Sequence, residues 1–129
     1  NIVAANAIVT SKINVAEIRF SRRKLRSIIY NLVSNAIKFK SPKRQPKIVV
    51  TTKKKNNYII ISVKDNGVGI AKSKFEAIFS KYYRLENAIE GSGIGLYLVK
   101  EIVTNAGGKI SLVSQLGKGS EFKVHLKIE

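Results

Sequence analysis

The most regular hydrophobic pattern in the chain lies in residues 21–39. Its apolar positions follow the i, i+3, i+4 spacing of an amphipathic helix. They are Leu25, Ile28, Ile29, Leu32, Val33 and Ala36. Ser21 stands just before them and is a suitable N-cap, because its hydroxyl can accept a hydrogen bond from a free N–H of the first turn. The pattern therefore predicts a helix over residues 21–39.

A second helical pattern occupies residues 94–106, where an apolar residue recurs at each turn. Gly107 and Gly108 follow it, and such glycines commonly close a helix in a left-handed conformation. Upstream, residues 72–83 read "KSKFEAIFSKYY" and suggest a short helix. Residues 84–92 show little periodicity and predict a loop.

Four other apolar runs have the two-residue period and β-branched content of strands. "KIVVTT" and "YIIISV" flank a lysine-rich tip, and "KISLVS" and "EFKVHLKI" flank "QLGKGS", which predicts two antiparallel hairpins. In the last run apolar residues alternate with polar ones, so we expect one buried and one solvent-facing side. The sole histidine, His125, falls on the solvent-facing side. We interpret it as a bystander.

Helices and hairpins in this order are typical of an α+β fold. We expect a two-layer α/β sandwich, with a mixed, mostly antiparallel sheet covered on one face by helices. A length of 129 residues and a hydrophobic content of 44% fit one domain with a single core. Residues 1–20 are mixed in pattern, although "AEIRF" has strand character. We interpret them as the lead-in strand region of a domain spanning residues 1–129.

Composition excludes several classes of site. Without cysteine there is no disulfide and no thiolate zinc site, and one histidine cannot form a histidine metal cluster. No apolar run approaches the roughly 20 residues that span a bilayer, and the first residues lack the pattern of a signal peptide. We therefore expect a soluble, cytoplasmic chain.

The net charge of +16 is the strongest compositional signal. It first suggests an anionic partner such as nucleic acid, nucleotide, lipid headgroups or an acidic protein. The basic residues cluster at the start of the first predicted helix, in the connector 43–47 and at the tip 53–55, and solvated loops and faces account for most of them. The usual nucleic-acid motifs are missing, so no nucleic acid partner is expected.

A polar stripe runs along the first predicted helix, opposite its apolar side. At about 100° per residue, this stripe contains Ser27, Asn31, Asn35 and Lys38. Asparagine is unfavourable inside a helix because its amide competes with the backbone, so two of them one turn apart suggest a function. A carboxamide oxygen suits Mg²⁺ and a lysine suits phosphate, which favours a site for a metal bound to phosphates. The alternative is a solvated polar face.

The chain's one aspartate, Asp65, stands where the second predicted strand gives way to "NGVGI". Asp-Asn-Gly is good turn chemistry, and a simple turn is one interpretation. The other is that the carboxylate accepts a hydrogen bond from an amino group, while Gly67 and Gly69 let a flat ring approach the backbone.

Three further glycines stand in "GSGIGL" at the start of the second predicted helix. Free N–H groups and the helix dipole favour phosphate at such a position. The spacing differs from the Rossmann fingerprint and from the P-loop, and the glycines follow a loop where both of those motifs follow a strand. Neither of those two nucleotide folds is expected.

Taken in order, these motifs resemble those of the ATP-binding catalytic domain of sensor histidine kinases. That domain belongs to the superfamily that includes gyrase, heat-shock-chaperone and mismatch-repair ATPases. "NLVSNAIKF" is similar to the family's asparagine box, "FEAIFSKYYR" to its phenylalanine box, and "DNGVGI", "GSGIGL" and "GKGSEF" to its glycine boxes. The resemblance covers residues 21–128, with every box in family order.

On the phosphate side, the resemblance implies that Asn35 holds Mg²⁺ against the ATP phosphates, with Asn31 and Lys38 beside it. Residues 82–92 would form an ATP lid, from which Arg84 could reach the γ-phosphate. The glycines that hinge the lid and present amides to phosphate would be Gly91, Gly93 and Gly95.

On the adenine side, the resemblance implies that Asp65 accepts the adenine amino group and that Phe39 packs against the ring. The other positions carried over to ATP binding are Gly67, Gly69, Leu96 and Ser120. Phe75 and Phe79 would anchor the base of the lid.

The resemblance implies a kinase of two-component signalling. The chain would bind Mg-ATP, and in a longer protein the γ-phosphoryl group would pass to a histidine on a separate dimerisation domain and then to a response regulator. The chain has no acceptor-histidine segment, so we interpret it as a fragment, monomeric alone, of a homodimer that could be anchored in the inner membrane. ATPase relatives carry a glutamate where Ser27 stands, and a hydroxyl is too weak a base to activate water.

Two alternatives remain open. A protein-serine kinase of the anti-sigma-factor type shares these motifs and needs no attached acceptor histidine. A non-catalytic basic binding module would account for the charge but not for the motifs.

Overall fold

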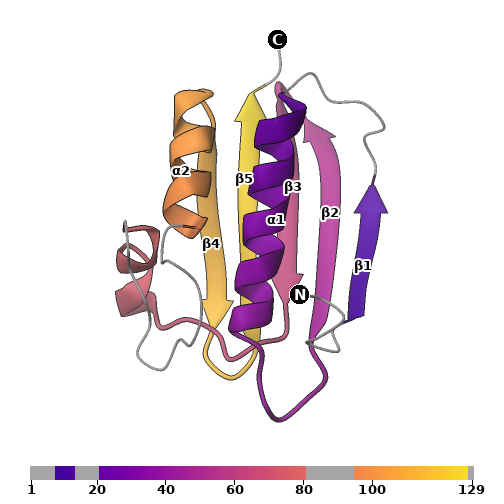
Figure 1. Cartoon of the computed structure of the whole chain (residues 1–129), viewed down its shortest axis with the longest axis vertical. Coiled ribbons are helices and arrows are strands. Elements are labelled where there is room, and N and C mark those ends of the chain that lie inside the picture. Colours follow the sequence, from indigo (N-terminus) through magenta and orange to yellow (C-terminus); the bar gives the residue numbers. More distant parts are fainter. Residues whose placement is uncertain (1–7, 14–20, 81–94, 128–129) are drawn as a thin grey trace.

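The described part of the molecule has two layers, a five-stranded sheet and a set of helices on one of its faces (Figure 1). The computed structural model describes residues 8–13, 21–80 and 95–127. The strands are β1 (Ile8–Ile13), β2 (Lys47–Lys55), β3 (Tyr58–Asp65), β4 (Lys109–Gln115) and β5 (Gly119–Lys127). The helices are α1 (Arg22–Lys38), α2 (Gly95–Asn105) and two short 3₁₀ helices, Lys72–Lys74 and Ala77–Phe79. The expected α+β sandwich is confirmed.

The strands are arranged in the order β1-β2-β3-β5-β4. Both predicted hairpins are present, β2 with β3 and β4 with β5, and β3 and β5 are also antiparallel. β1 is parallel to β2, which makes the sheet mixed. β1 falls within residues 1–20, which were interpreted as the lead-in strand region, although the strand character noted at residues 16–20 lies outside the described residues.

The core lies between the helices and the inner face of the sheet. α1 contributes Ile28, Leu32 and Ala36, in the predicted helical spacing. In β5, Phe122, Val124 and Leu126 are buried in the same core and alternate with more exposed polar residues, so the predicted alternation is confirmed over the described residues 121–127. Burying each large apolar side chain contributes about 1.5–3 kcal/mol, and this burial holds the two layers together.

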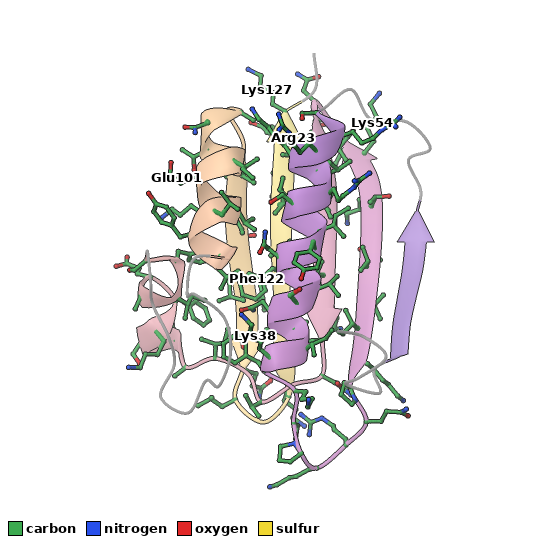
Figure 2. All side chains as sticks on the ribbon, viewed as in Figure 1. Arg23, Lys38, Lys54, Glu101, Phe122 and Lys127 are labelled. Atoms are coloured by element: carbon green, nitrogen blue, oxygen red, sulfur yellow. The ribbon has the colours of Figure 1, made fainter. Side chains whose placement is uncertain are left out.

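One end of the sandwich collects several segments that are far apart in sequence (Figure 1). α1 finishes there, β3 ends there at Asp65, and β4 turns into β5 there, while the start of α2 lies beside Asn31 of α1 and faces this end. Figure 2 shows Lys38 at this end, whereas Arg23, Lys54 and Lys127 lie at the opposite end. The motif residues of the polar stripe and of the glycine boxes thus come from elements that meet at one edge.

Residues 72–80, the described part of the predicted helix 72–83, differ from the single short helix that the sequence predicts. The structure has two separate 3₁₀ helices in this segment, and Ser80 is extended with a ψ of 146°. The apolar residues Phe75, Ile78 and Phe79 span little more than one turn, which is too short for a stable α-helix.

The helices among the described residues include none that is both long enough and apolar enough to cross a membrane.

Candidate functional site

Asp65 ends β3 with a buried carboxylate. Two backbone N–H groups donate to its Oδ1, from Gly67 at 2.8 Å and from Ser120 at 3.3 Å. Burial raises the pKa of Asp65, and the hydrogen bonds from Gly67 and Ser120 oppose that rise. Because both bonds from the described residues end on Oδ1, Oδ2 is the oxygen that a ligand would meet. The group is suited to accept a hydrogen bond from an amino group.

Residues 66–70, which we call the wall loop, follow Asp65 and are held from two sides. A Cβ on Gly67 would overlap the carbonyl oxygen of Phe39, and that oxygen accepts a hydrogen bond from Val68 N at 2.9 Å. On the other side Gly69, with a φ of 79°, lies directly against the backbone of Gln115. Phe39, Gly67 and Gly69 therefore lie together, as the resemblance requires, and the close backbone approach explains the glycines.

The polar stripe on α1 lies near the start of α2. Asn31 and Asn35 are half-buried, and Lys38 is exposed at the end of the helix. Asn31 Nδ2 donates to Ser27 O at 2.8 Å and to Ser27 Oγ at 3.2 Å, so its amide nitrogen is held within the helix. A Cβ on Gly95 would lie 3.1 Å from Asn31 Oδ1. The carboxamide oxygen of Asn31 thus faces the N-terminus of α2, a place that favours phosphate.

Ser120 pairs with Asp65 across β3 and β5, and it is buried. Its Oγ lies 2.7 Å from Ser114 Oγ, which also accepts from Ile70 N at 2.7 Å and donates to Gly119 O at 2.9 Å. Ser114 therefore connects the wall loop to the start of β5. Ser114 could not be recognised from the sequence, because a serine in a strand with mixed neighbours carries no distinctive signal.

The predicted base of the lid packs on the core. Phe75 and Phe79 lie against the buried cluster, and the rings of Phe79 and Phe122 make an edge-to-face contact with centroids 6.1 Å apart. Lys100 Nζ lies 5.8 Å from the centroid of the Phe79 ring. Leu96 is buried in the same core cluster, on the first turn of α2.

Three of the predicted site residues, and the lid itself, cannot be placed. Arg84, Gly91 and Gly93, like the whole of residues 82–92, lie outside the described residues.

Arg44 is a site residue that the sequence analysis missed. It was assigned to a solvated basic connector between α1 and β2, yet its guanidinium contacts the wall loop. Nε donates to Asn66 O at 2.6 Å, and Nη2 donates to Gly67 O at 2.8 Å and to Gly117 O at 3.0 Å. All three acceptors are backbone carbonyls, which no side-chain motif reveals.

Comparison with known proteins places the chain among ATPases of one family. Residues 20–129 match the family described as histidine kinase-, DNA gyrase B- and HSP90-like ATPase. The chain is 34% identical over 106 residues to the sensor protein RprX of Bacteroides fragilis, a match that covers 79% of this chain and 20% of RprX. It is 36% identical over 110 residues to the circadian input-output histidine kinase CikA of Synechococcus elongatus, covering 82% of this chain and 14% of CikA. The chain thus spans a fifth or less of the length of these relatives.

Solved structures show the same fold. The mycobacterial sensor histidine kinase MprB superposes with a TM-score of 0.82 at 20% identity, covering 95% of this chain and 83% of MprB's. The catalytic domain of histidine kinase ThkA gives a TM-score of 0.81 at 24% identity, covering 98% of this chain and 82% of that one. With the family match over residues 20–129, the conclusion is that this chain belongs to the histidine kinase-, DNA gyrase B- and HSP90-like ATPase family.

Proposed function

We propose that this chain binds Mg-ATP at the end of the sandwich where Asp65, the polar stripe of α1 and the start of α2 meet. The observation that carries the proposal is the convergence of two kinds of group at this end. The buried carboxylate of Asp65 offers an acceptor for the adenine amino group, and Asn31 beside the first residue of α2 offers a place for phosphates. Membership of an ATPase family supports the same assignment.

Mg²⁺ fits the donor set on α1. The described residues contain no cluster of three His, Cys, Asp or Glu side chains that could hold a metal by themselves. A half-buried carboxamide such as Asn35 suits a cation that takes its other ligands from phosphate oxygens and water, as Mg²⁺ does. We assign Asn35 to Mg²⁺, with Asn31 and Lys38 at the phosphates. Bound Mg²⁺ would neutralise charge on the phosphates.

In the longer protein we propose phosphoryl transfer to a histidine. A nitrogen of that histidine, on a dimerisation domain, attacks the γ-phosphorus, the bond to the bridging oxygen breaks, and ADP leaves. A response regulator then receives the phosphoryl group. The part of this chain is to orient ATP and to neutralise charge. The names of the relatives, a sensor protein and a histidine kinase, support this role.

His125 is not the acceptor in this proposal. Its neighbour Val124 is buried in the core, so His125 lies on the sheet face that the helices do not cover, in edge-to-face contact with Tyr58. The chain alone, incubated with γ-labelled ATP, should therefore remain unlabelled.

We expect slow hydrolysis of bound ATP because Ser27 stands where ATPase relatives carry a glutamate. Its hydroxyl accepts a hydrogen bond from Asn31 and is too weak a base to activate water. We expect the isolated chain to bind ATP and release very little phosphate. A phosphate-release assay that shows many turnovers per minute would contradict the kinase assignment.

A nucleotide titration with and without Mg²⁺ tests the binding site. The unaltered chain should bind ATP more tightly with Mg²⁺, and Asn35→Ala should lose most of that gain. Asn105→Ala, the same chemical change at the exposed far end of α2, serves as the control and should bind as the parent does. The proposal fails if the parent has no affinity for Mg-ATP, or if Asn35→Ala keeps the full Mg²⁺-dependent gain.

A further inference from the structure

Arg44 contacts three backbone carbonyls from two distant segments. Its acceptors, Asn66 O and Gly67 O in the wall loop and Gly117 O in the turn between β4 and β5, are 22, 23 and 73 residues away in sequence. A guanidinium presents its N–H donors in a rigid planar fork, so it can hold several carbonyls in fixed directions. A lysine ammonium, a rotating point charge on a flexible stem, cannot reproduce that arrangement.

Arg44 and Asp65 are hydrogen-bonded to opposite sides of the same peptide unit. Asn66 O and Gly67 N belong to the same peptide, and the described chain has no cis bond, so the C=O and the N–H point in opposite directions. Arg44 holds the oxygen of this unit at 2.6 Å, and Asp65 Oδ1 accepts from its N–H at 2.8 Å. Any rotation of this peptide plane would therefore break both bonds.

The next peptide unit is held in the same way. Gly67 O accepts from Arg44 Nη2, and Val68 N on the other side of that unit donates to the carbonyl of Phe39. Phe39 is the residue that the family resemblance places against the base. The two consecutive peptides held by Arg44 thus lead to the two residues assigned to adenine.

We propose that Arg44 is a positioning residue for adenine recognition, because its guanidinium fixes the two peptide planes that orient the Asp65 carboxylate and the end of α1. The inference rests on the proposed function, which places adenine at Asp65. Arg44 itself does not touch the nucleotide in this arrangement. Its effect is on how strongly the site prefers adenine to other bases.

Other bonds should keep the connector attached without Arg44, which makes the inference testable. Asn66 Oδ1 accepts from Lys47 N at 2.9 Å, and Asn66 Nδ2 donates to Gln45 O at 3.1 Å. These two bonds anchor the start of β2 independently of the guanidinium. We therefore expect variants of Arg44 to fold, while the two peptide units between Asn66 and Val68 lose the bonds that hold their oxygens.

The first test compares ATP with inosine triphosphate, in which a carbonyl oxygen replaces the amino group that Asp65 would recognise. We expect the unaltered chain to prefer ATP, and we expect Arg44→Lys and Arg44→Ala to lower that preference by about tenfold, mainly through weaker binding of ATP. Lys43→Ala removes an exposed positive charge from the same connector and should keep the preference. A general loss of positive charge or of stability would lower the affinity for both nucleotides by the same factor and leave the preference unchanged.

The second test uses Asp65 as a spectroscopic probe, because it is the one aspartate in the chain and its carboxyl carbon gives a distinct NMR signal. The N–H of Gly67 lowers the pKa of Asp65, so loosening the peptide should raise that pKa in Arg44→Lys, where the positive charge is kept. Lys43→Ala should leave the pKa of Asp65 almost unchanged. Should Arg44→Ala fail to fold, Arg44→Lys decides the question by both measurements.

The outcomes separate the inference from the function on which it rests. If the unaltered chain shows no preference for ATP over inosine triphosphate, the assignment of adenine to Asp65 is wrong whatever the variants do. If that preference exists and Arg44→Lys retains it, with the pKa of Asp65 unchanged, then Arg44 is not a positioning residue.

Discussion

Asp65 is subject to two opposing requirements. Recognition of an amino group needs an acceptor, whereas burial disfavours the charged form and raises the pKa above its ordinary value of 3.8. With a raised pKa in the folded state, the contribution of this group to stability is fully present below pH 3.8 and is lost as the pH rises through the folded-state pKa. At neutral pH the ionised carboxylate therefore reduces stability, which is typical of a residue retained for function.

Substitution of Asp65 by asparagine separates these two effects. Asp65→Asn keeps an oxygen that can accept from Gly67 and Ser120, but places an N–H₂ donor where Oδ2 would meet the adenine amino group. We expect ATP affinity to fall by about tenfold or more, while the melting temperature at pH 7 stays the same or rises. ATP titration and thermal unfolding measure the two quantities. Unchanged ATP affinity would mean that the base does not bind at Asp65.

At the scale of elements, the sequence pattern predicted the helices and strands whose formation depends on residues close together in the chain. α1, β2 and β5 follow the period of their apolar residues, because each of these elements buries one side. β3 is buried on both sides, and its unbroken apolar run next to the lysine-rich tip is what predicted it as a strand. β1 could not be predicted in this way, since its parallel partner β2 lies across α1, with Ile8 paired to Lys47. Its sequence, "IVTSKI", also lacks a clear alternation.

The candidate site likewise contains residues that the motifs predicted and residues that only the folded structure reveals. Asn31, Asp65 and Gly67 were predicted because the resemblance rests on their side chains or on the absence of one. Arg44 and Ser114 were missed because most of their partners are backbone atoms of other segments, and those contacts exist only once the chain has folded.

The C-terminus of α2 is an element boundary that the sequence predicted in detail. Gly107 has a φ of 77°, and its N–H bonds to Thr104 O at 3.0 Å. Gly108 N bonds to Val103 O at 2.9 Å, which completes a Schellman motif. The two glycines are needed for different reasons, because only Gly107 has the left-handed backbone, whereas Gly108 lies against the backbone of His125 in β5.

Alanine substitutions should distinguish these two reasons. In Gly107→Ala the added Cβ has no atom within 4 Å. The free energy of unfolding should therefore fall only by the cost of a left-handed non-glycine residue, about 1–2 kcal/mol. Gly108→Ala would overlap His125 O and should destabilise the domain more, because the turn between α2 and β4 would have to move away from β5. Chemical denaturation of both variants measures the difference. Equal losses would show that the contact with β5 relaxes without cost.

On the scale of the whole molecule, positive charge gathers on the sheet face that the helices leave open. Ile61, Val63 and Val124 point into the core, so the residues that alternate with them face outwards. By strand register, the lysines of β2 to β5 on that outer face are Lys47, Lys53, Lys55, Lys64, Lys109, Lys123 and Lys127. Glu121 shares the face, and its Oε2 accepts a hydrogen bond from Ser62 Oγ at 2.5 Å. Part of the net charge of +16 is therefore carried by a face of the sheet that the helices do not cover.

His125 lies on the same face, and the nearby lysines affect its pKa. We therefore expect the stability of the domain to depend on pH through this residue. Its Nδ1 is buried and has no hydrogen-bond partner among the described residues. Burial lowers the pKa of His125 below 6.5, and the charges of Lys109, Lys123 and Lys55 lower it further. Because the unfolded chain binds the proton more readily, stability is fully present above pH 6.5 and falls as the pH drops from there towards the folded-state pKa.

Thermal unfolding between about pH 7.5 and 5.5, the range in which histidine titrates, should show this decline in the parent chain. His125→Gln should remove most of it, since glutamine cannot take up the proton. Added salt should weaken it, because screening raises the pKa of His125 towards its ordinary value. Lys109→Gln should act in the same direction at low salt, by removing one of the nearby charges. A decline of equal size in the parent and in His125→Gln would locate the pH dependence elsewhere in the chain.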